Sequence, residues 1–148
     1  MRAGEGVVTL DSNVFVCALK ADERYSAKCK EIIRKVPRSF LLSEPAVFYQ
    51  EVCGTVARKA GAVAARLVRD RLDQMIQPGL LFSCDREYCI SAYPLCGEFG
   101  IYAVDALYFK TAIDANGILI SLDEEDFLSK VRTNPYHVEV LHPSDFSD

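Results

Sequence analysis

Short apolar runs alternate with longer stretches of helical periodicity along the whole chain. The runs that we interpret as strands lie at residues 7–10, 39–42, 80–83, 118–121 and 138–141. Between them, apolar residues recur at intervals of three and four, which is typical of amphipathic helices. Strands separated by helices favour a parallel sheet covered on both faces. The pattern therefore predicts an α/β fold with a central, mostly parallel sheet of about four to five strands flanked by helices.

The helical stretches differ in length and in how they end. Residues 13–36 are interpreted as one or two helices with an interruption near Ala21 and Asp22. Ser43 is expected to cap the next helix, with Pro45 in its first turn. Gly61 separates that helix from another over residues 62–76, so we expect a helical hairpin. Further helices are expected over residues 87–95, 104–115 and 124–130.

Composition supports a single globular domain over residues 1–148. Half of the 148 residues are hydrophobic and 26% are charged, which is enough to build a buried core. No apolar run approaches the roughly 20 residues that span a bilayer, and the first residues lack the features of a signal peptide. The six cysteines contain no CxxC pair and lie far from both histidines in sequence, which argues against a zinc site. We expect a cytoplasmic protein that does not associate with membranes.

Acidic residues stand directly after two of the expected strands. Asp11 follows the run VVTL, and Asp123 follows ILISL. Asp105 opens the helix before the second of these strands, and Glu51 lies in the middle of an apolar helix. Each of the three aspartates could instead be an ordinary helix cap or first-turn acid, and Glu51 could be a surface residue.

Together these acids indicate a metal site. Ligand sites in open parallel sheets lie beyond the carboxyl ends of the strands, where acids from neighbouring strands would meet. Two carboxylates about 4 Å apart repel by roughly 4 kcal/mol at an effective dielectric constant of 20, so a cluster needs compensation. Mg²⁺ and Mn²⁺ prefer oxygen ligands, and such ions can activate water for attack on a phosphodiester.

The four segments LDSN (10–13), YQEV (49–52), VDALYFKTA (104–112) and ISLDEEDF (120–127) together resemble the PIN domain family, including the VapC-type toxins. The resemblance extends from about residue 7 to residue 141. It implies a three-layer fold and a Mg²⁺- or Mn²⁺-dependent endoribonuclease that releases a 3′ hydroxyl. It assigns catalysis and metal binding to five acids: Asp11, Glu51, Asp105, Asp123 and Asp126.

The resemblance also implies supporting residues and leaves two weaker candidates. Ser12, Asn13 and Ser121 match the polar positions beside the first and fourth acids. Glu44 competes with Glu51 for the second position, and Glu124 competes with Asp126 for the fifth. We favour Glu51 and Asp126.

Charge is divided unevenly along the chain. Residues 1–74 carry 13 Lys plus Arg against 9 Asp plus Glu, whereas residues 75–148 carry 4 against 12. A basic helical region could meet a polyanion, although a solvated helix face would look the same. The candidates for contacts with an RNA backbone are Arg58, Lys59, Arg66 and Arg69. The resemblance further implies a homodimer and, for a toxin of a type II toxin-antitoxin pair, a small antitoxin protein as partner.

Other functions predict different sequence features. A haloacid-dehalogenase-like phosphatase needs a second Asp at position 13, where this chain has Asn, and a receiver-like phosphoacceptor needs a Lys after a late strand, where this chain has none. Both are disfavoured. The remaining alternative is a non-catalytic PIN-like scaffold that binds RNA or protein.

Overall fold

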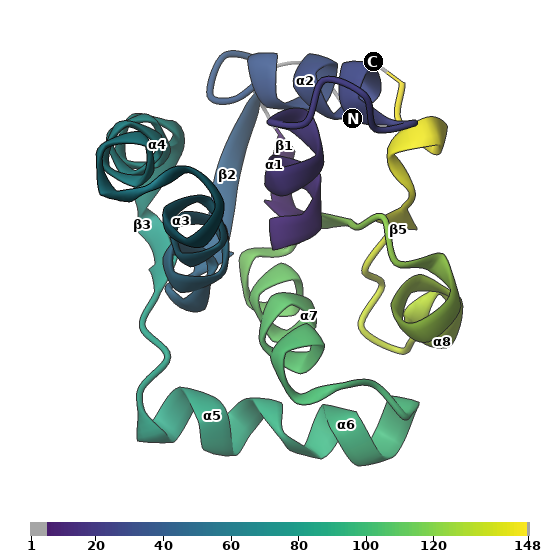
Figure 1. The fold of residues 1–148 in the computed structure, drawn as a ribbon. Helices are drawn as coiled ribbons and strands as arrows, with labels where there is room; N and C mark the ends of the chain where they lie inside the picture. Colours follow the sequence, from purple (N-terminus) through teal and green to yellow (C-terminus); the bar gives the residue numbers. More distant parts are fainter. Residues whose placement is uncertain (1–5, 148) are drawn as a thin grey trace.

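A computed structural model describes residues 6–147, and Figure 1 shows a sheet enclosed by helices. The sheet has five strands in the order β3-β2-β1-β4-β5, and every neighbouring pair is parallel. The strands are β1 (Gly6–Leu10), β2 (Phe40–Pro45), β3 (Ile76–Phe82), β4 (Ile118–Ile120) and β5 (Val140–Leu141). The predicted α/β fold with a parallel sheet is confirmed.

Helices connect each strand to the next. They are α1 (Ser12–Ala18), α2 (Ser26–Arg34), α3 (Val47–Ala60), α4 (Ala62–Met75), α5 (Arg86–Ala92), α6 (Pro94–Phe99), α7 (Ala103–Ala115) and α8 (Ser129–Val131), with a π-helical turn η1 (Glu124–Leu128) and a 3₁₀ turn η2 (Pro143–Asp145). The expected hairpin of α3 and α4 is present, and Gly61 joins the two helices with a φ of 91°. That backbone conformation is readily open only to glycine.

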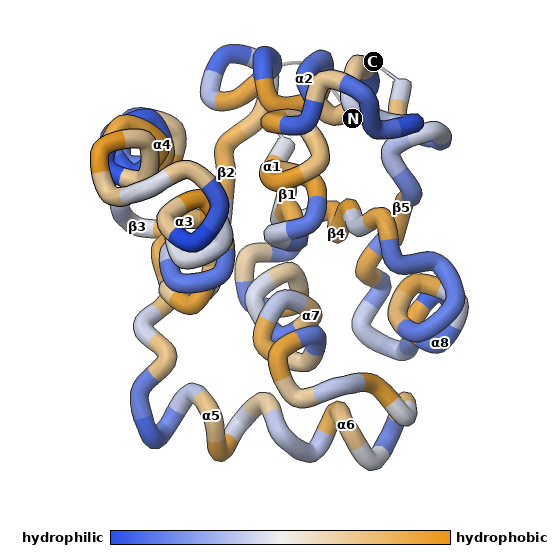
Figure 2. The backbone as a smooth tube through the Cα atoms, viewed as in Figure 1, coloured by the Kyte–Doolittle hydropathy of each residue, from blue (hydrophilic) through white to orange (hydrophobic). Residues whose placement is uncertain are grey.

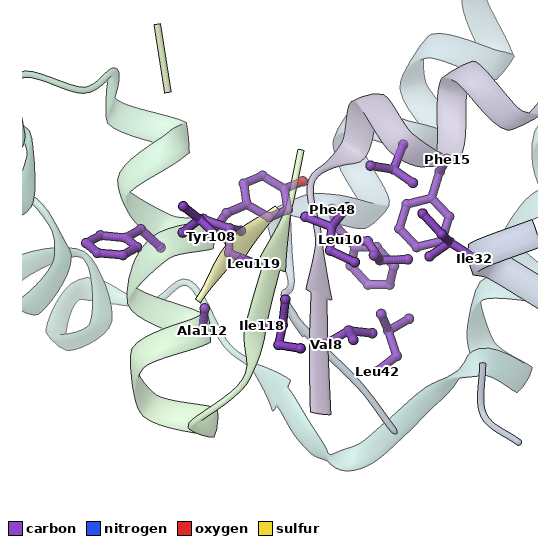
Figure 3. Close-up of a cluster of buried hydrophobic side chains, with 14 of the residues drawn as sticks. Val8, Leu10, Phe15, Ile32, Leu42, Phe48, Tyr108, Ala112, Ile118 and Leu119 are labelled. Carbon is purple, nitrogen blue, oxygen red and sulfur yellow. The ribbon is translucent and has the colours of Figure 1, made fainter. Parts of the chain in front are cut away.

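Three layers make up the molecule. Figure 3 shows Tyr108 and Ala112 of α7 on one side of the central strands, and Phe15 and Phe48 of α1 and α3 on the other. All four side chains are buried or nearly so. The strands β1 and β4 between them are coloured mainly as hydrophobic in Figure 2, as expected for strands covered on both faces. Burial of these two apolar faces holds the sheet between its helices.

Two boundaries differ from the sequence-based expectation. Ser43 does not cap a helix but lies in β2, where its buried hydroxyl is 2.7 Å from the hydroxyl of Thr9 in β1. Pro45 is the last residue of that strand. Strand β3 begins at Ile76, so Pro78 lies inside it. Since β3 is the edge of the sheet, a proline there interrupts no central ladder.

The strand order places a switch point between β1 and β4. From β1 the chain builds outward through β2 and β3 on one side, and β4 and β5 lie on the other. Asp11 N donates a 2.9 Å hydrogen bond to the carbonyl of Ile120, which fixes the ends of these two strands together. Crevices in open parallel sheets form at such a point.

The described part of the chain, residues 6–147, contains neither a membrane-spanning helix nor a disulfide bond. Among the helices within residues 6–147, none is long and apolar enough to cross a bilayer. All six cysteines lie in this range and are free thiols.

Candidate active site

The acids predicted from sequence come from four different elements at the carboxyl edge of the sheet. Asp11 follows β1 and is the N-cap of α1, and Asp123 follows β4 and is the N-cap of η1. Asp105 lies in the first turn of α7, and Glu51 lies in the second turn of α3. Asp11 is only 6% exposed, while the other three are partly buried.

Asp11 is held by a network of side chains. The Ser121 hydroxyl donates a 2.7 Å hydrogen bond to Asp11 Oδ2, and the Asn13 amide donates to the same oxygen at 3.2 Å. Asn13 also donates to Ser121 Oγ at 3.1 Å and accepts from the backbone N–H of Leu122. The Ser12 hydroxyl lies 3.5 Å from Asp11 Oδ1, which is at the limit of a hydrogen bond. Asn13 and Ser121 therefore orient Asp11, and Ser12 contributes little.

Beyond β4, the acids of η1 separate into two groups. Asp126 donates its backbone N–H to Asp123 Oδ1 at 3.0 Å, and both side chains are partly buried. Glu124 instead forms two hydrogen bonds with Arg132, at 2.7 and 2.8 Å. This pairing lowers the pKa of Glu124. Arg132 therefore neutralises the charge of Glu124, and this ion pair does not include the other acids.

Glu51 is joined to the opposite layer of the fold. The hydroxyl of Tyr108, on α7, donates a 2.7 Å hydrogen bond to Glu51 Oε1. Tyr108 is fully buried, so its hydroxyl has a fixed position. This contact brings the carboxylate of α3 toward the edge at which Asp105 of α7 lies.

The acids share one electrostatic field. Burial raises the pKa of Asp11 to about 6. The hydrogen bond from Ser121 acts in the opposite direction, and the charges of Glu51 and Asp123 raise the pKa further. Burial also raises the pKa of Asp105 to about 7, and the charged groups that act on it next are Asp11, Asp123, Glu51 and Asp126 in turn. Negative charges from the other predicted acids therefore act on Asp11 and Asp105 and make these two carboxyl groups harder to ionise.

Glu44 is a further acid in this region. It lies in β2 rather than on a helix, and it is fully buried. Neither of its carboxylate oxygens has a hydrogen-bond partner among residues 6–147. Burial raises its pKa well above the usual value, and the charges of Asp11 and Glu51 contribute to the same direction. The sequence predicts a helix that begins at Ser43 and Pro45, which would place Glu44 on the same helix as Glu51. The structure places Glu44 in β2 instead.

The side chains that could bind a metal ion at this site offer oxygen atoms as ligands. Within residues 6–147, no group of three or more His, Cys, Asp or Glu side chains already stands in a metal-binding arrangement. The donors that approach one another are all carboxylates and hydroxyls, and the strongest charges acting on Asp105 are all negative. The unpartnered oxygens of Glu44 add to this excess. Such an oxygen-only, negatively charged set fits a hard divalent cation such as Mg²⁺ or Mn²⁺ and does not fit zinc.

The basic residues proposed for RNA contacts lie on the helical hairpin. Arg58 and Lys59 are in the last turn of α3, and Arg66 and Arg69 are on α4. All four are exposed. Arg69 is paired with Asp70 at 2.9 Å, and none of the contacts described for residues 6–147 joins the four to the acids. They are a surface beside the acidic edge and are not part of it.

Comparisons with known proteins agree with this fold. The sequence model of one family, described as the PIN domain, matches residues 8–133. A comparison with curated protein sequences found no match.

Solved structures with the same fold are distant in sequence. A toxin-antitoxin complex from Klebsiella pneumoniae has a TM-score of 0.67 at 16% identity and covers 92% of this chain and 97% of that chain. VapC20 from Mycobacterium tuberculosis, described as a sarcin-ricin loop cleaving toxin, has a TM-score of 0.66 at 15% identity, with 86% and 99% covered. VapBC2 from Rickettsia felis, bound to a DNA fragment from its promoter, has a TM-score of 0.62 at 14% identity, with 92% and 98% covered. At these identities the likeness concerns the fold alone.

Proposed function

The chain belongs to the PIN domain family, and from that premise we propose that it is a Mg²⁺- or Mn²⁺-dependent endoribonuclease that hydrolyses RNA phosphodiester bonds. The observation that carries the proposal is the meeting of Asp11 and Asp123 at the ends of β1 and β4, where the Ser121 hydroxyl donates to Asp11 and accepts from the backbone N–H of Asp123. The charges of Asp11, Asp123, Glu51 and Asp126 also act on Asp105, whose pKa is raised to about 7 mainly by burial. Carboxylates held close together repel one another. A cation that binds among them offsets this repulsion and so stabilises the folded state.

The residues have separate roles in this proposal. The acids that would hold the ion are Asp11, Glu51, Asp105, Asp123 and Asp126. A bound ion would supply an activated water as nucleophile and positive charge beside the scissile phosphate. Ser121 and Asn13 keep Asp11 in one orientation, and Tyr108 does the same for Glu51. The pairing of Glu124 with Arg132 supports Asp126 as the fifth acid.

Loss of cleavage in two acid variants tests this function. Purified wild type is incubated with labelled single-stranded and structured RNAs in Mg²⁺, in Mn²⁺ and in EDTA. We expect cleavage only with metal. In Asp11→Asn and Asp105→Asn we expect a loss of at least about 100-fold, which exceeds the usual effect of residues that only support a metal ligand.

A matched control lies on the same helix as Asp105. Asp114 pairs with Lys110 at 3.0 Å, and Asp114→Asn is expected to cleave like wild type. If wild type is inert with both metals on every RNA, the nuclease proposal is wrong and the non-catalytic scaffold takes its place.

An apolar groove supports the proposal of an antitoxin partner. The groove has a volume of about 350 Å³ and runs between α1, α2 and the α3–α4 hairpin. Leu19 and Leu67 line it and are 56% and 64% exposed, while Lys30, Arg34 and Arg71 provide positive charge. Such a surface suits a partner segment with apolar and acidic side chains. The structure of similar fold from Klebsiella pneumoniae is described as a toxin-antitoxin complex.

The antitoxin proposal has its own test. The chain is co-expressed with the short reading frame next to its gene, and co-purification is measured for wild type and Leu67→Glu. We expect the complex to be lost in Leu67→Glu while RNA cleavage by the isolated chain stays the same. We also propose a cytoplasmic homodimer, which light scattering of the purified protein would detect. A monomer at micromolar concentration would remove the dimer from the proposal.

A further inference from the structure

A hollow lies beside the acids, on the side of α1. It has a volume of about 360 Å³, which is in the range of small-ligand sites. Its lining includes Asn13, Val16, Lys20, Arg24, Tyr25 and Leu122. We call it the α1 pocket.

One end of the α1 pocket lies next to Asp11. Asn13 donates to Asp11 Oδ2 and accepts from the backbone N–H of Leu122, and both of these lining residues border the switch point between β1 and β4. From Asn13 the pocket follows α1 to its end at Ala18 for about 7.5 Å, at about 1.5 Å per residue, and continues to Lys20 beyond the helix. If one phosphate of a nucleic-acid strand lies at the acids, the neighbouring nucleotide would therefore lie in this pocket.

The far end of the pocket carries two cations and one acid. Lys20, Arg24 and Glu23 line it, and Lys20 forms an exposed ion pair of 3.4 Å with Glu23. Exposed pairs of this kind contribute little to stability, so a phosphate can replace the carboxylate. The pKa of Lys59 is lowered, and the largest cause is the charge of Lys20 beside it. Because α1 and α3 are in contact, Lys20 just after α1 connects the pocket with Arg58 and Lys59 in the last turn of α3.

An aromatic side chain forms a fixed wall of the pocket. The Tyr25 ring packs edge-on against the His142 ring, with 4.6 Å between centroids. The guanidinium of Arg24 lies 5.0 Å from the Tyr25 centroid. His142 is itself oriented by Ser144, whose hydroxyl lies 2.8 Å from its Nδ1. Aromatic rings held in this way, beside cations, are the usual elements of sites for single-stranded nucleic acid.

We propose that the α1 pocket binds one nucleotide of a single-stranded RNA next to the scissile phosphate, with Lys20 and Arg24 on the backbone and Tyr25 against the base. Beyond this nucleotide the strand passes Lys59 and Arg58. The proposal rests on the proposed nuclease function and assigns to it a substrate subsite and a strand path.

Binding measured without cleavage tests this subsite. The Asp105→Asn variant in EDTA is titrated against a 5′-labelled single-stranded oligoribonucleotide, and fluorescence anisotropy gives Kd at several salt concentrations. Lys20→Ala/Arg24→Ala is then added to the same background. We expect Kd to rise about tenfold or more, and the slope of log K against log salt to fall by about 1.4, because about 0.7 is lost for each phosphate contact on a single strand.

Variants of Tyr25 separate base contact from charge. Tyr25→Leu is expected to weaken binding about fivefold or more with an unchanged salt slope, and Tyr25→Phe is expected to restore it. Circular dichroism verifies that each variant is folded. Arg86→Ala serves as the charge control, because Arg86 is an exposed residue of α5 at the opposite end of the molecule from α2 (Figure 1).

The outcomes distinguish this inference from the nuclease function. If the Lys20/Arg24 double variant binds with the affinity and salt slope of its background, the subsite is wrong even when wild type cleaves RNA. If wild type does not cleave but binding depends on the pocket, the nuclease proposal is wrong and the pocket belongs to an RNA-binding scaffold. If the double variant loses an antitoxin and not RNA, the pocket is a protein contact and our assignment is overturned.

Discussion

The Ser121 hydroxyl donates to Asp11 Oδ2 at 2.7 Å and joins residues that are 110 positions apart in the chain. Ser121 Oγ in turn accepts hydrogen bonds from the Asn13 amide and from the backbone N–H of Asp123, each at 3.1 Å. One buried hydroxyl therefore links the loops that follow β1 and β4. It orients the first acid and places the fourth.

Removal of this hydroxyl is expected to destabilise the protein. Ser121→Ala removes the partner of the Asp123 N–H and one hydrogen bond each from Asp11 and Asn13, which should lower the free energy of unfolding by about 1–3 kcal/mol. Urea denaturation measures this. Ser12→Ala is the matched control, since its 3.5 Å contact is marginal, and it should change stability by less than about 0.5 kcal/mol. Equal effects of the two substitutions would contradict the assigned network.

Stability of the metal-free protein is expected to fall as pH rises. The pKa values of Asp11 and Asp105 are raised from 3.8 to about 6 and about 7, so folding favours their protonated forms. Their contribution is complete below the unfolded pKa near 4 and is lost as pH rises through 6 and 7. In EDTA we therefore expect a lower Tm at pH 8 than at pH 5. The Asp11→Asn/Asp105→Asn double variant should show a flatter dependence.

Divalent cations are expected to reverse this trend. Carboxylates must be deprotonated to bind a metal, so Mn²⁺ should raise the Tm more at pH 8 than at pH 5. Thermal unfolding followed by fluorescence in Mn²⁺ and in EDTA gives both differences. A Tm increase that is the same at both pH values would place the ion elsewhere on the protein.

Substitution of Glu44 by its neutral isostere is expected to stabilise the metal-free protein. Its raised pKa means that the native state disfavours the ionised carboxyl, and this cost grows as pH rises above the unfolded value near 4.5. Glu44→Gln should therefore raise the Tm at pH 8 and leave it nearly unchanged at pH 4. Glu87→Gln, at an exposed site on α5, should have little effect at either pH. A lower Tm at pH 8 for Glu44→Gln would show that the ionised carboxylate is favoured.

Two glycines are expected to respond to alanine in opposite directions. A Cβ on Gly117 would lie 2.8 Å from the carbonyl oxygen of Val7, because the turn before β4 passes close to β1. Gly117→Ala should cost about 1–3 kcal/mol, as overpacking usually does. Gly97 lies in α6 with open space around it, so Gly97→Ala should stabilise by about 0.5–1 kcal/mol. Urea denaturation of both variants checks the sign of each effect.

Much of the architecture follows from the sequence alone. Apolar runs such as VVTL and helical periodicity such as that of α4 are local patterns, and burial selects the same elements in the fold. The positions of Asp11 and Asp123 after central strands are also local features. Their roles as metal ligands stay a prediction until metal binding is measured.

Only the tertiary structure decided the features that depend on contacts between residues far apart in the chain. The sequence leaves Glu124 and Asp126 in competition, with Asp126 favoured, and the structure separates them because Glu124 pairs with Arg132. Ser43 and Glu44 resemble a helix start, and only the packing of β2 between β1 and β3 makes them buried strand residues. The α1 pocket likewise needs Leu122 beside α1. Local periodicity determines the type of each element, but strand pairing and shared charge arise between residues far apart in the chain, and no local pattern specifies them.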